Sequence, residues 1–323
     1  MAKITLAGAI AYDRICTTHT SLQSYGAKPL LNLKLESQHL AQGGCGANIA
    51  FNLGQIGHDV DLYASTGRLD DSRCLTDLAN LGINTHGILR ISEAETAQAT
   101  IITDPEGIQF TAFYPGPIVE PSVWRDWLTS IFTVAGSVFI QAPLPANLML
   151  AGMEHAKLLG AQIIWCPGQY ADQLSSSDIS AMLPFCALLV GNEHEISHLS
   201  NAVDLSQVCT IMSAGADPVT ISTTAGRTSV QIPSNPNAVD PTGCGDALVA
   251  GIAHTVAGIG AGVGADTKAD KDQADKDIRG LTNEQLEQAV QCGIEFAQCC
   301  IRTTGSQAHS LAAILEDTTN PRA

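Results

Sequence analysis

Short apolar segments alternate with segments of helical spacing along most of this chain. The apolar segments predict strands at residues 3–11, 60–65, 83–91, 136–141, 161–166 and 187–191. Helices are expected at residues 43–57, 72–81, 203–212 and 281–303, where small and apolar residues recur every three or four positions. Strands that alternate with helices are typical of an α/β fold, here a doubly wound and mostly parallel sheet flanked by helices.

Two extended segments, residues 14–39 and 96–114, interrupt this alternation and predict a second, small sheet. The later segment contains a good hairpin turn, Asp-Pro-Glu-Gly at residues 104–107. Another hairpin is expected from residues 219–223 and 228–232. Residues 260–280 are low in complexity and acidic, which indicates a flexible insertion without chemistry of its own. We therefore expect a single domain over residues 1–323 that carries a projecting small sheet.

Composition and charge exclude several classes of protein. The formal net charge of −16 argues against a nucleic-acid partner, since phosphate backbones are held by clustered Lys and Arg. The chain has no apolar run long enough to predict a membrane span. Its ten cysteines form no Cys-x-x-Cys pair and most lie in apolar or small-residue settings, which favours reduced thiols in a cytoplasmic enzyme.

The most informative stretch is Asp-Pro-Thr-Gly-Cys-Gly-Asp-Ala at residues 240–247, just before a segment with helical spacing. The N–H groups in the first turn of a helix lack intrahelical partners and form an anion site together with the helix dipole. Gly243, Cys244 and Gly245 would supply this site, and Asp246 would then accept a proton from a hydroxyl that attacks phosphorus. A simpler interpretation is a tight turn with a capping carboxylate.

This stretch resembles the C-terminal signature of the ribokinase-like (PfkB) family of sugar and nucleoside kinases. Gly-Gly-Cys-Gly-Ala-Asn at residues 43–48 resembles the family's N-terminal signature, in the expected order and at a family-like separation. The resemblance implies transfer of the γ-phosphoryl group of ATP with Mg²⁺, and it makes the small sheet a lid over the site. Whether a monovalent cation such as K⁺ is also needed stays open, and the resemblance allows a homodimer formed through the lid.

The resemblance also assigns residues to the two ligands. It places the acceptor on Asp13, on the backbone of Gly43 and Gly44, and on Asn48, although Asn48 could instead cap a helix. Mg²⁺ would be held through water by Asn192 and Glu195. Further ATP contacts are expected from residues that lie near the nucleotide in such kinases, namely Ser213, Gly215, Thr242 and Gly305. In the loop that contains Ser213 and Gly215, Asp-Pro replaces the usual second glycine of the family.

The identity of the acceptor depends on weaker signals. The segments at residues 44–53 and 111–116 resemble bacterial adenosine kinase-like members of the family, and Phe113 could stack on a purine or belong to the core of the lid. A nucleoside is therefore expected, with a ribose- or fructose-type sugar as the alternative. The string His-Glu-Ile-Ser-His at residues 194–198 leaves a zinc peptidase through His194 and His198 as a remote alternative, because this spacing places two imidazoles on one helix face.

Overall fold

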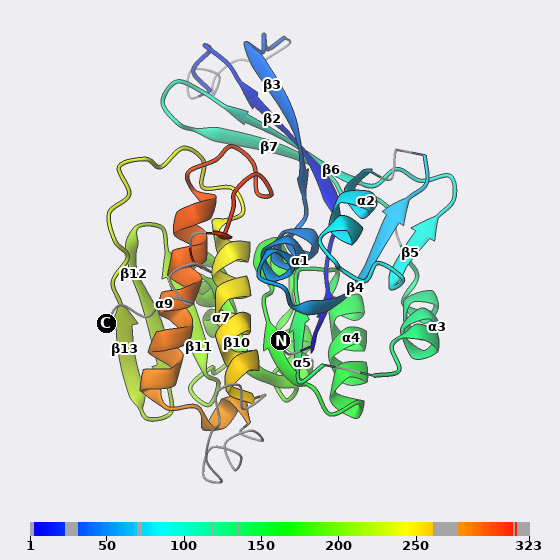
Figure 1. Ribbon diagram of the computed structural model, residues 1–323, viewed down its shortest axis with the longest axis vertical. Coiled ribbons are helices and arrows are strands. Elements are labelled where there is room, and N and C mark those ends of the chain that lie inside the picture. The colour runs from blue at the N-terminus through cyan, green and yellow to red at the C-terminus, as the bar shows by residue number, and fades with distance from the viewer. Residues whose placement is uncertain are drawn as a thin grey trace.

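A nine-stranded sheet forms the centre of the protein in a computed structural model that describes residues 3–22, 32–69, 73–117, 119–134, 136–260, 277–312 and 314 (Figure 1). Its strand order is β13-β12-β11-β10-β9-β8-β1-β4-β5, and every neighbouring pair is parallel except β11–β12 and β12–β13. The strands are β1 (Lys3–Ala7), β4 (Asp59–Gly67), β5 (Ile88–Ile91), β8 (Val138–Gln141), β9 (Gln162–Trp165), β10 (Cys186–Asn192), β11 (Thr210–Ala214), β12 (Asp217–Thr223) and β13 (Gly226–Val230).

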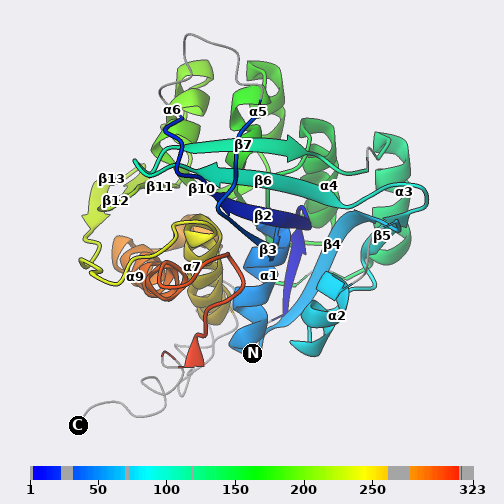
Figure 2. The same ribbon diagram turned by 90° about the horizontal axis from the view of Figure 1, so that it is seen from above.

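Helices cover both faces of this sheet, as the view from above shows (Figure 2). One face carries α1 (Cys45–Gln55), α2 (Arg73–Asn80), α7 (Cys244–Gly260) and α9 (Asn283–Cys300). The other face carries α3 (Pro121–Ile131), α4 (Ala146–Leu158), α5 (Ser176–Met182) and α6 (Glu193–Ala202). Two short 3₁₀ helices, η2 (Gly168–Gln173) and η3 (Ile278–Gly280), lie in the connections. Within the described ranges, each helix is too short or too polar to cross a lipid bilayer.

The core is divided between the two faces because successive strand side chains point to opposite sides of a sheet. Ile140 and Ile164 pack in the cluster with α1, α7 and α9, whereas Phe139 and Ile163 pack with α3, α4 and α5. The strands are therefore apolar in nearly every position, as expected for a parallel sheet covered on both faces.

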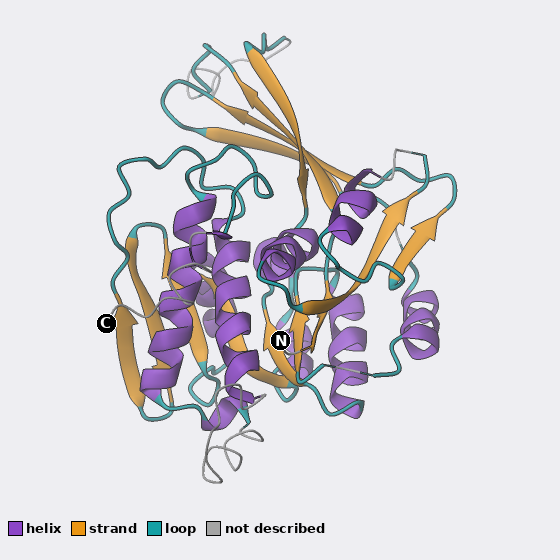
Figure 3. Ribbon diagram, viewed as in Figure 1, coloured by secondary structure: helices purple, strands orange, loops and turns teal. Residues whose placement is uncertain are grey.

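A separate four-stranded sheet stands beside the main one, and we call it the small sheet (Figure 3). Its order is β3-β2-β6-β7, from the strands β2 (Ala11–Thr17), β3 (Ser37–Gly43), β6 (Ala97–Thr103) and β7 (Gln109–Tyr114). The predicted fold class and the predicted second sheet are thus confirmed. The strands of the small sheet extend beyond the predicted segment 14–39, since β2 begins at Ala11 and β3 ends at Gly43.

Three predicted elements are corrected by the structure. The helix expected at 203–212 is wrong, because α6 ends at Ala202 and β11 begins at Thr210. The strand expected at 3–11 is two strands in different sheets, so Asp13 lies within β2 rather than after a central strand. The strand expected at 83–91 is formed only over Ile88–Ile91. Most of the predicted insertion, residues 261–276, lies outside the described residues.

Candidate active site

The turn before α7 is open on the side where a ligand would lie. The main-chain N–H groups of Gly245 and Asp246 have no hydrogen-bond acceptor within the part of the chain that the structure describes. A Cβ placed on Gly245 would contact nothing within 4 Å. Gly243 adopts a φ of +83°, and a Cβ there would lie 2.4 Å from Cβ of Ser306, so only glycine fits. An anion site at a helix N-terminus needs free donors of this kind, whereas the N–H of Cys244, which the sequence also predicts in that site, donates to the carbonyl oxygen of Pro241 at 3.1 Å.

Asp246 is held beside this turn by donors from α1. Nδ2 of Asn48 donates a hydrogen bond of 2.8 Å to Oδ2 of Asp246, and the Cys45 thiol also hydrogen bonds to this carboxylate. Burial raises the pKa of Asp246 to about 7, the two hydrogen bonds oppose that rise, and the charges of Asp13 and Glu195 add to it. A carboxylate whose pKa lies near 7 is suited to general base chemistry at neutral pH.

The orientation of Asn48 is fixed by the loop that follows α9. Its Oδ1 accepts hydrogen bonds from Oγ of Ser306 at 2.8 Å and from Nε2 of Gln307 at 2.9 Å. The amide therefore directs its nitrogen toward Asp246. Sequence reasoning missed Ser306 and Gln307 as side chains of the site, because no local motif marks them and they lie about 260 residues from Asn48 in the chain.

Asp240, the first residue of the signature, joins two other predicted residues. Its Oδ1 accepts from N–H of Thr242 at 2.9 Å, and its Oδ2 accepts from N–H of Gly305 at 3.0 Å. Gly305 packs against Ala41 of β3 and lines a cavity of about 500 Å³ between β3 and α2, whose lining does not include Asp246. The structure therefore brings Thr242 and Gly305 together around the Asp240 carboxylate.

The predicted acceptor residues gather where the small sheet meets the main domain. Asp13 is buried, and a Cβ on Gly43 would lie 2.1 Å from its Oδ2, so the strand pairing of β2 with β3 leaves room only for glycine there. Burial raises the pKa of Asp13 to about 6, with a further contribution from the charge of Asp240. Gly44 follows directly with a φ of +88° and leads into α1.

Phe113 of β7 lines a separate cavity of about 240 Å³ at the base of the small sheet. Its other walls include the aromatic ring of Tyr170, the amides of Asn147 and Gln169, and several prolines. Gln169 also accepts a hydrogen bond of 3.7 Å from the Cys45 thiol. Because the Cys45 thiol also hydrogen bonds to Asp246, this cavity lies next to the carboxylate.

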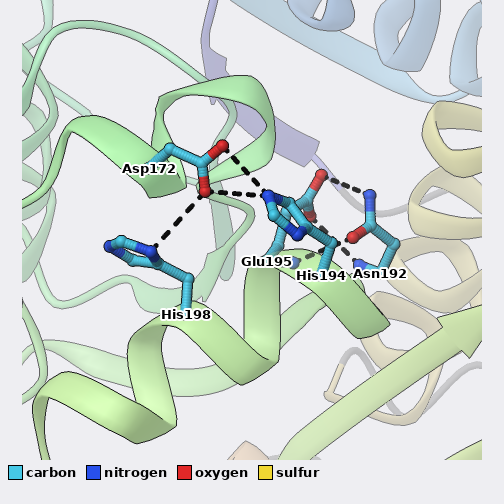
Figure 4. Close-up of polar contacts among 5 residues, drawn as sticks. All are labelled: Asp172, Asn192, His194, Glu195 and His198. Carbon is cyan, nitrogen blue, oxygen red and sulfur yellow. Dashed lines mark hydrogen bonds and ion pairs between the residues drawn. The ribbon is translucent and has the colours of Figure 1, made fainter.

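Asn192 and Glu195 form a reciprocal capping box at the start of α6 (Figure 4). Oδ1 of Asn192 accepts from N–H of Glu195 at 2.9 Å, while the Glu195 carboxylate accepts from both the backbone and the side chain of Asn192. Burial raises the pKa of Glu195, and its hydrogen bond from Asn192 opposes that rise. Ser213 pairs with Asn192 across β10 and β11, and Gly215 follows it in the next turn, so these predicted ATP contacts share one edge of the sheet.

His194 and His198 point from α6 toward Asp172 of η2 (Figure 4). The ion-pair distances are 3.0 Å for His194 and 3.6 Å for His198, and the His194 pKa is raised by its hydrogen bond to Asp172. Among the described residues, no group of three or more His, Cys, Asp or Glu side chains could hold a metal ion. The two histidines thus connect α6 to η2.

Comparison with known proteins agrees with this architecture. The family model for pfkB family carbohydrate kinases matches residues 1–313. A nucleoside kinase of Methanothermobacter thermautotrophicus is 25% identical over 236 residues, which cover 69% of this chain and 74% of that protein.

Solved structures with the same fold include two nucleoside kinases and a ribokinase. The Burkholderia thailandensis nucleoside kinase in complex with inosine has a TM-score of 0.75 at 21% identity, over 95% of this chain and 94% of that one. The Methanocaldococcus jannaschii nucleoside kinase has a TM-score of 0.76 at 22% identity, over 99% of both chains. Ribokinase from Giardia lamblia has a TM-score of 0.78 at 17% identity, over 100% of this chain and 99% of that one. The predicted resemblance is confirmed: the chain belongs to the pfkB family of carbohydrate kinases, and it is a nucleoside or sugar kinase of that type.

Proposed function

We propose that this protein transfers the γ-phosphoryl group of ATP to a primary hydroxyl group of a nucleoside. The observation that carries the proposal is the position of Asp246, beside the open N–H groups of its own helix turn and next to the cavity lined by Phe113. A kinase of the family needs these three parts together: an oxyanion site, a base and an acceptor pocket.

Asp246 is the general base in this mechanism. Its carboxylate accepts the proton from the acceptor hydroxyl while the N–H groups of Gly245 and Asp246 donate to the phosphoryl oxygens. Phosphoryl transfer has a loose transition state, so alignment and charge stabilisation supply most of the catalysis. A single preorganised donor of this kind contributes about 2.7–4 kcal/mol in other enzymes, and a positioned base contributes about 10²–10⁴-fold.

Asn192 and Glu195 fit a magnesium ion that is bound through water. Mg²⁺ prefers oxygen ligands and retains several waters, and Glu195 offers a carboxylate that the capping box holds in one orientation. Such an ion would neutralise phosphate charge. It would also offset the repulsion from Glu195 that contributes to the raised pKa of Asp246.

A nucleoside suits the acceptor pocket better than a free sugar does. The cavity at the base of the small sheet has aromatic side chains in Phe113 and Tyr170, and amides in Asn147 and Gln169 that can bond to the edge of a base. Asp13 is close enough to Asp246 to raise its pKa, which suits a role in binding ribose hydroxyls there. The small sheet would act as a lid that excludes water, which otherwise competes with the acceptor for the phosphoryl group.

The outer side of the small sheet supports a homodimer as a second part of the proposal. Leu40, Phe110 and Tyr114 are 61%, 57% and 46% exposed, which is unusual for large apolar side chains within one small sheet. A second copy of the chain would cover these side chains through the lid. Sedimentation velocity tests this: the protein should sediment as a dimer, and Phe110→Ser should shift it toward a monomer.

The function is tested with Asp246→Asn in a coupled assay of ADP release over adenosine, inosine, guanosine, ribose and fructose. The variant should fold and bind ATP, yet lose turnover at least ~100-fold. The matched control is Asp59→Asn, which removes an exposed carboxylate at the start of β4 and should keep normal turnover. Near-normal turnover by Asp246→Asn would remove this residue as the base. Faster turnover of ribose or fructose than of every nucleoside would make the protein a sugar kinase.

A further inference from the structure

Two cysteine thiols lie close to each other next to the turn before α7. Cys244 is the first residue of α7 and Cys300 is the last residue of α9, and these two helices pack along each other (Figure 1). The Cys244 thiol donates to the carbonyl oxygen of Ala297 at 3.7 Å, and the Cys300 thiol donates to the carbonyl oxygen of Thr242. Sγ of Cys300 lies 3.4 Å from the carbonyl oxygen of Thr242, and a Cβ on Gly243 would lie 3.5 Å from the same sulfur. The pair therefore lies against the backbone that forms the phosphoryl site.

The two thiols differ in accessibility and in pKa, so that one suits attack on a small disulfide and the other suits resolution of the mixed disulfide that results. Cys244 is partly accessible, whereas Cys300 is fully buried. The adjacent Cys300 thiol lowers the pKa of the Cys244 thiol, against the opposing effects of burial and of the charges of Asp240 and Asp246. Cys244 also begins a helix, where the positive end of the dipole favours a thiolate. In contrast, burial raises the pKa of the thiols of Cys45, Cys166 and Cys209.

We propose that Cys244 and Cys300 form an intrachain disulfide when the protein meets a low-molecular-weight disulfide, and that this bond reversibly inactivates the site. The Cys244 thiolate attacks one sulfur of the small disulfide, forms a mixed disulfide and releases the first small thiolate. Cys300 then loses its proton, attacks Sγ of Cys244 and expels the second small thiolate. Two protein thiols are oxidised by two electrons, the small disulfide is reduced, and both protons end on the two small thiols.

The disulfide would change the conformation of the turn before α7, because its two cysteines belong to different helices. A disulfide holds its two sulfurs about 2.05 Å apart, closer than any non-bonded contact, so the start of α7 is drawn toward the end of α9. The first turn of α7 carries the free N–H groups of Gly245 and Asp246. A displacement of about 1 Å in a catalytic constellation can cost about 100-fold in rate. We expect oxidation to lower phosphotransfer by at least about 10-fold, and bound ATP to protect the pair by covering Cys244.

The test treats purified protein with cystamine and then measures intact mass, a non-reducing peptide map and ADP release before and after addition of dithiothreitol. The treated wild-type protein should gain a peptide that joins Cys244 to Cys300, lose two hydrogens in mass, lose activity and recover on reduction. Cys300→Ser should instead accumulate a cysteamine adduct on Cys244, because the second thiol is absent. Cys299→Ser is the matched control, since it changes the neighbouring cysteine of the same helix and should behave as the wild type.

Two results would overturn the proposal. One is a stable cysteamine adduct on Cys244 of the wild-type protein with no peptide joining Cys244 to Cys300. The other is a complete crosslink that leaves ADP release unchanged. The effect on rate depends on the proposed phosphotransfer, but the mass and the peptide map do not. A failure of the disulfide is therefore distinguishable from a wrong acceptor, and the wild-type map decides the chemistry even if Cys300→Ser does not fold.

Discussion

The hydrogen bond from Asn48 to Asp246 offers a quantitative test of how this kinase sets the pKa of the proposed base. Nδ2 of Asn48 lies 2.8 Å from Oδ2 of Asp246, and this bond stabilises the ionised form of the carboxylate. A hydrogen bond to a charged group contributes about 1.5–3 kcal/mol, which corresponds to about one to two pKa units. Asn48→Ala should therefore raise the pKa of Asp246 from about 7 in the wild type by that amount.

The pH dependence follows from the sign of this shift. Because a general base must be ionised, activity is present above its pKa and is lost as pH falls through it. At pH 7 about half of the wild-type Asp246 is ionised, against about 1–10% in the variant, so kcat/KM should fall about 5- to 50-fold. At pH 9.5 the variant should recover most of that loss. The assay is the pH profile of kcat/KM for the acceptor between pH 6 and pH 10, measured by ADP release.

A matched control separates this effect from loss of stability. Asn52→Ala removes another buried amide from the same helix, one turn further along, where Asn52 donates to the carbonyl oxygen of Asn48 and accepts from His309. It should lower stability without moving the acid limb of the profile. A loss of activity in Asn48→Ala that is equal at every pH would refute the reasoning. In that case Asn48 would act by binding the acceptor, as the resemblance alone implies.

Two further outcomes are expected. Asp13→Ala should raise the KM for the acceptor far more than the KM for ATP in steady-state kinetics, and the reverse pattern would show that the two pockets are exchanged. His254→Leu should flatten the pH dependence of the free energy of unfolding. Burial lowers the pKa of His254 to about 4, so the unfolded chain binds a proton below about pH 6.5 that the folded protein does not, and stability is lost as pH falls toward 4. Urea denaturation at pH 7, 6 and 5 gives the free energy of unfolding, which should fall more steeply with decreasing pH for the wild type than for the variant. The difference between the two slopes should correspond to up to about one bound proton per chain. Equal slopes for the variant and the wild type would contradict this prediction.

The sequence predicted the alternating fold well because the strands of a covered parallel sheet are apolar on both faces. It failed at residues 203–212, where the spacing of Val203, Val208 and Met212 suggests a helix. In the structure, Asp204 accepts from N–H of Ser206 in a local turn, and Thr210 pairs with Leu189 of β10. The strand is thus formed by pairing with a partner 21 residues earlier, and such pairing overrides a weak helical pattern.

The two signatures predict candidate site residues, but they do not predict how the side chains of those residues are oriented. Asn48 was expected to hold a sugar hydroxyl, yet its amide is occupied on one side by Ser306 and Gln307 and on the other by Asp246. Cys45 was not among the predicted site residues, yet its thiol interacts with the Asp246 carboxylate. These contacts join segments that are far apart in the sequence, and hydrophobic periodicity carries no information about them.

The charge of the site explains why an acidic protein can still bind a polyanion. Asp13, Glu195 and Asp246 lie close enough that the first two raise the pKa of the third, and Asp240 raises the pKa of Asp13. Their mutual repulsion disfavours full ionisation before ligands bind, so part of the negative charge is removed by protonation near neutral pH. Binding of nucleotide with its cation would restore the ionised state of Asp246 just when a base is needed. Nucleotide binding should therefore release protons near pH 7. Calorimetry in two buffers of different ionisation enthalpy measures the number of protons released per bound nucleotide. Proton release that persists unchanged in Asp246→Asn would assign it to another group.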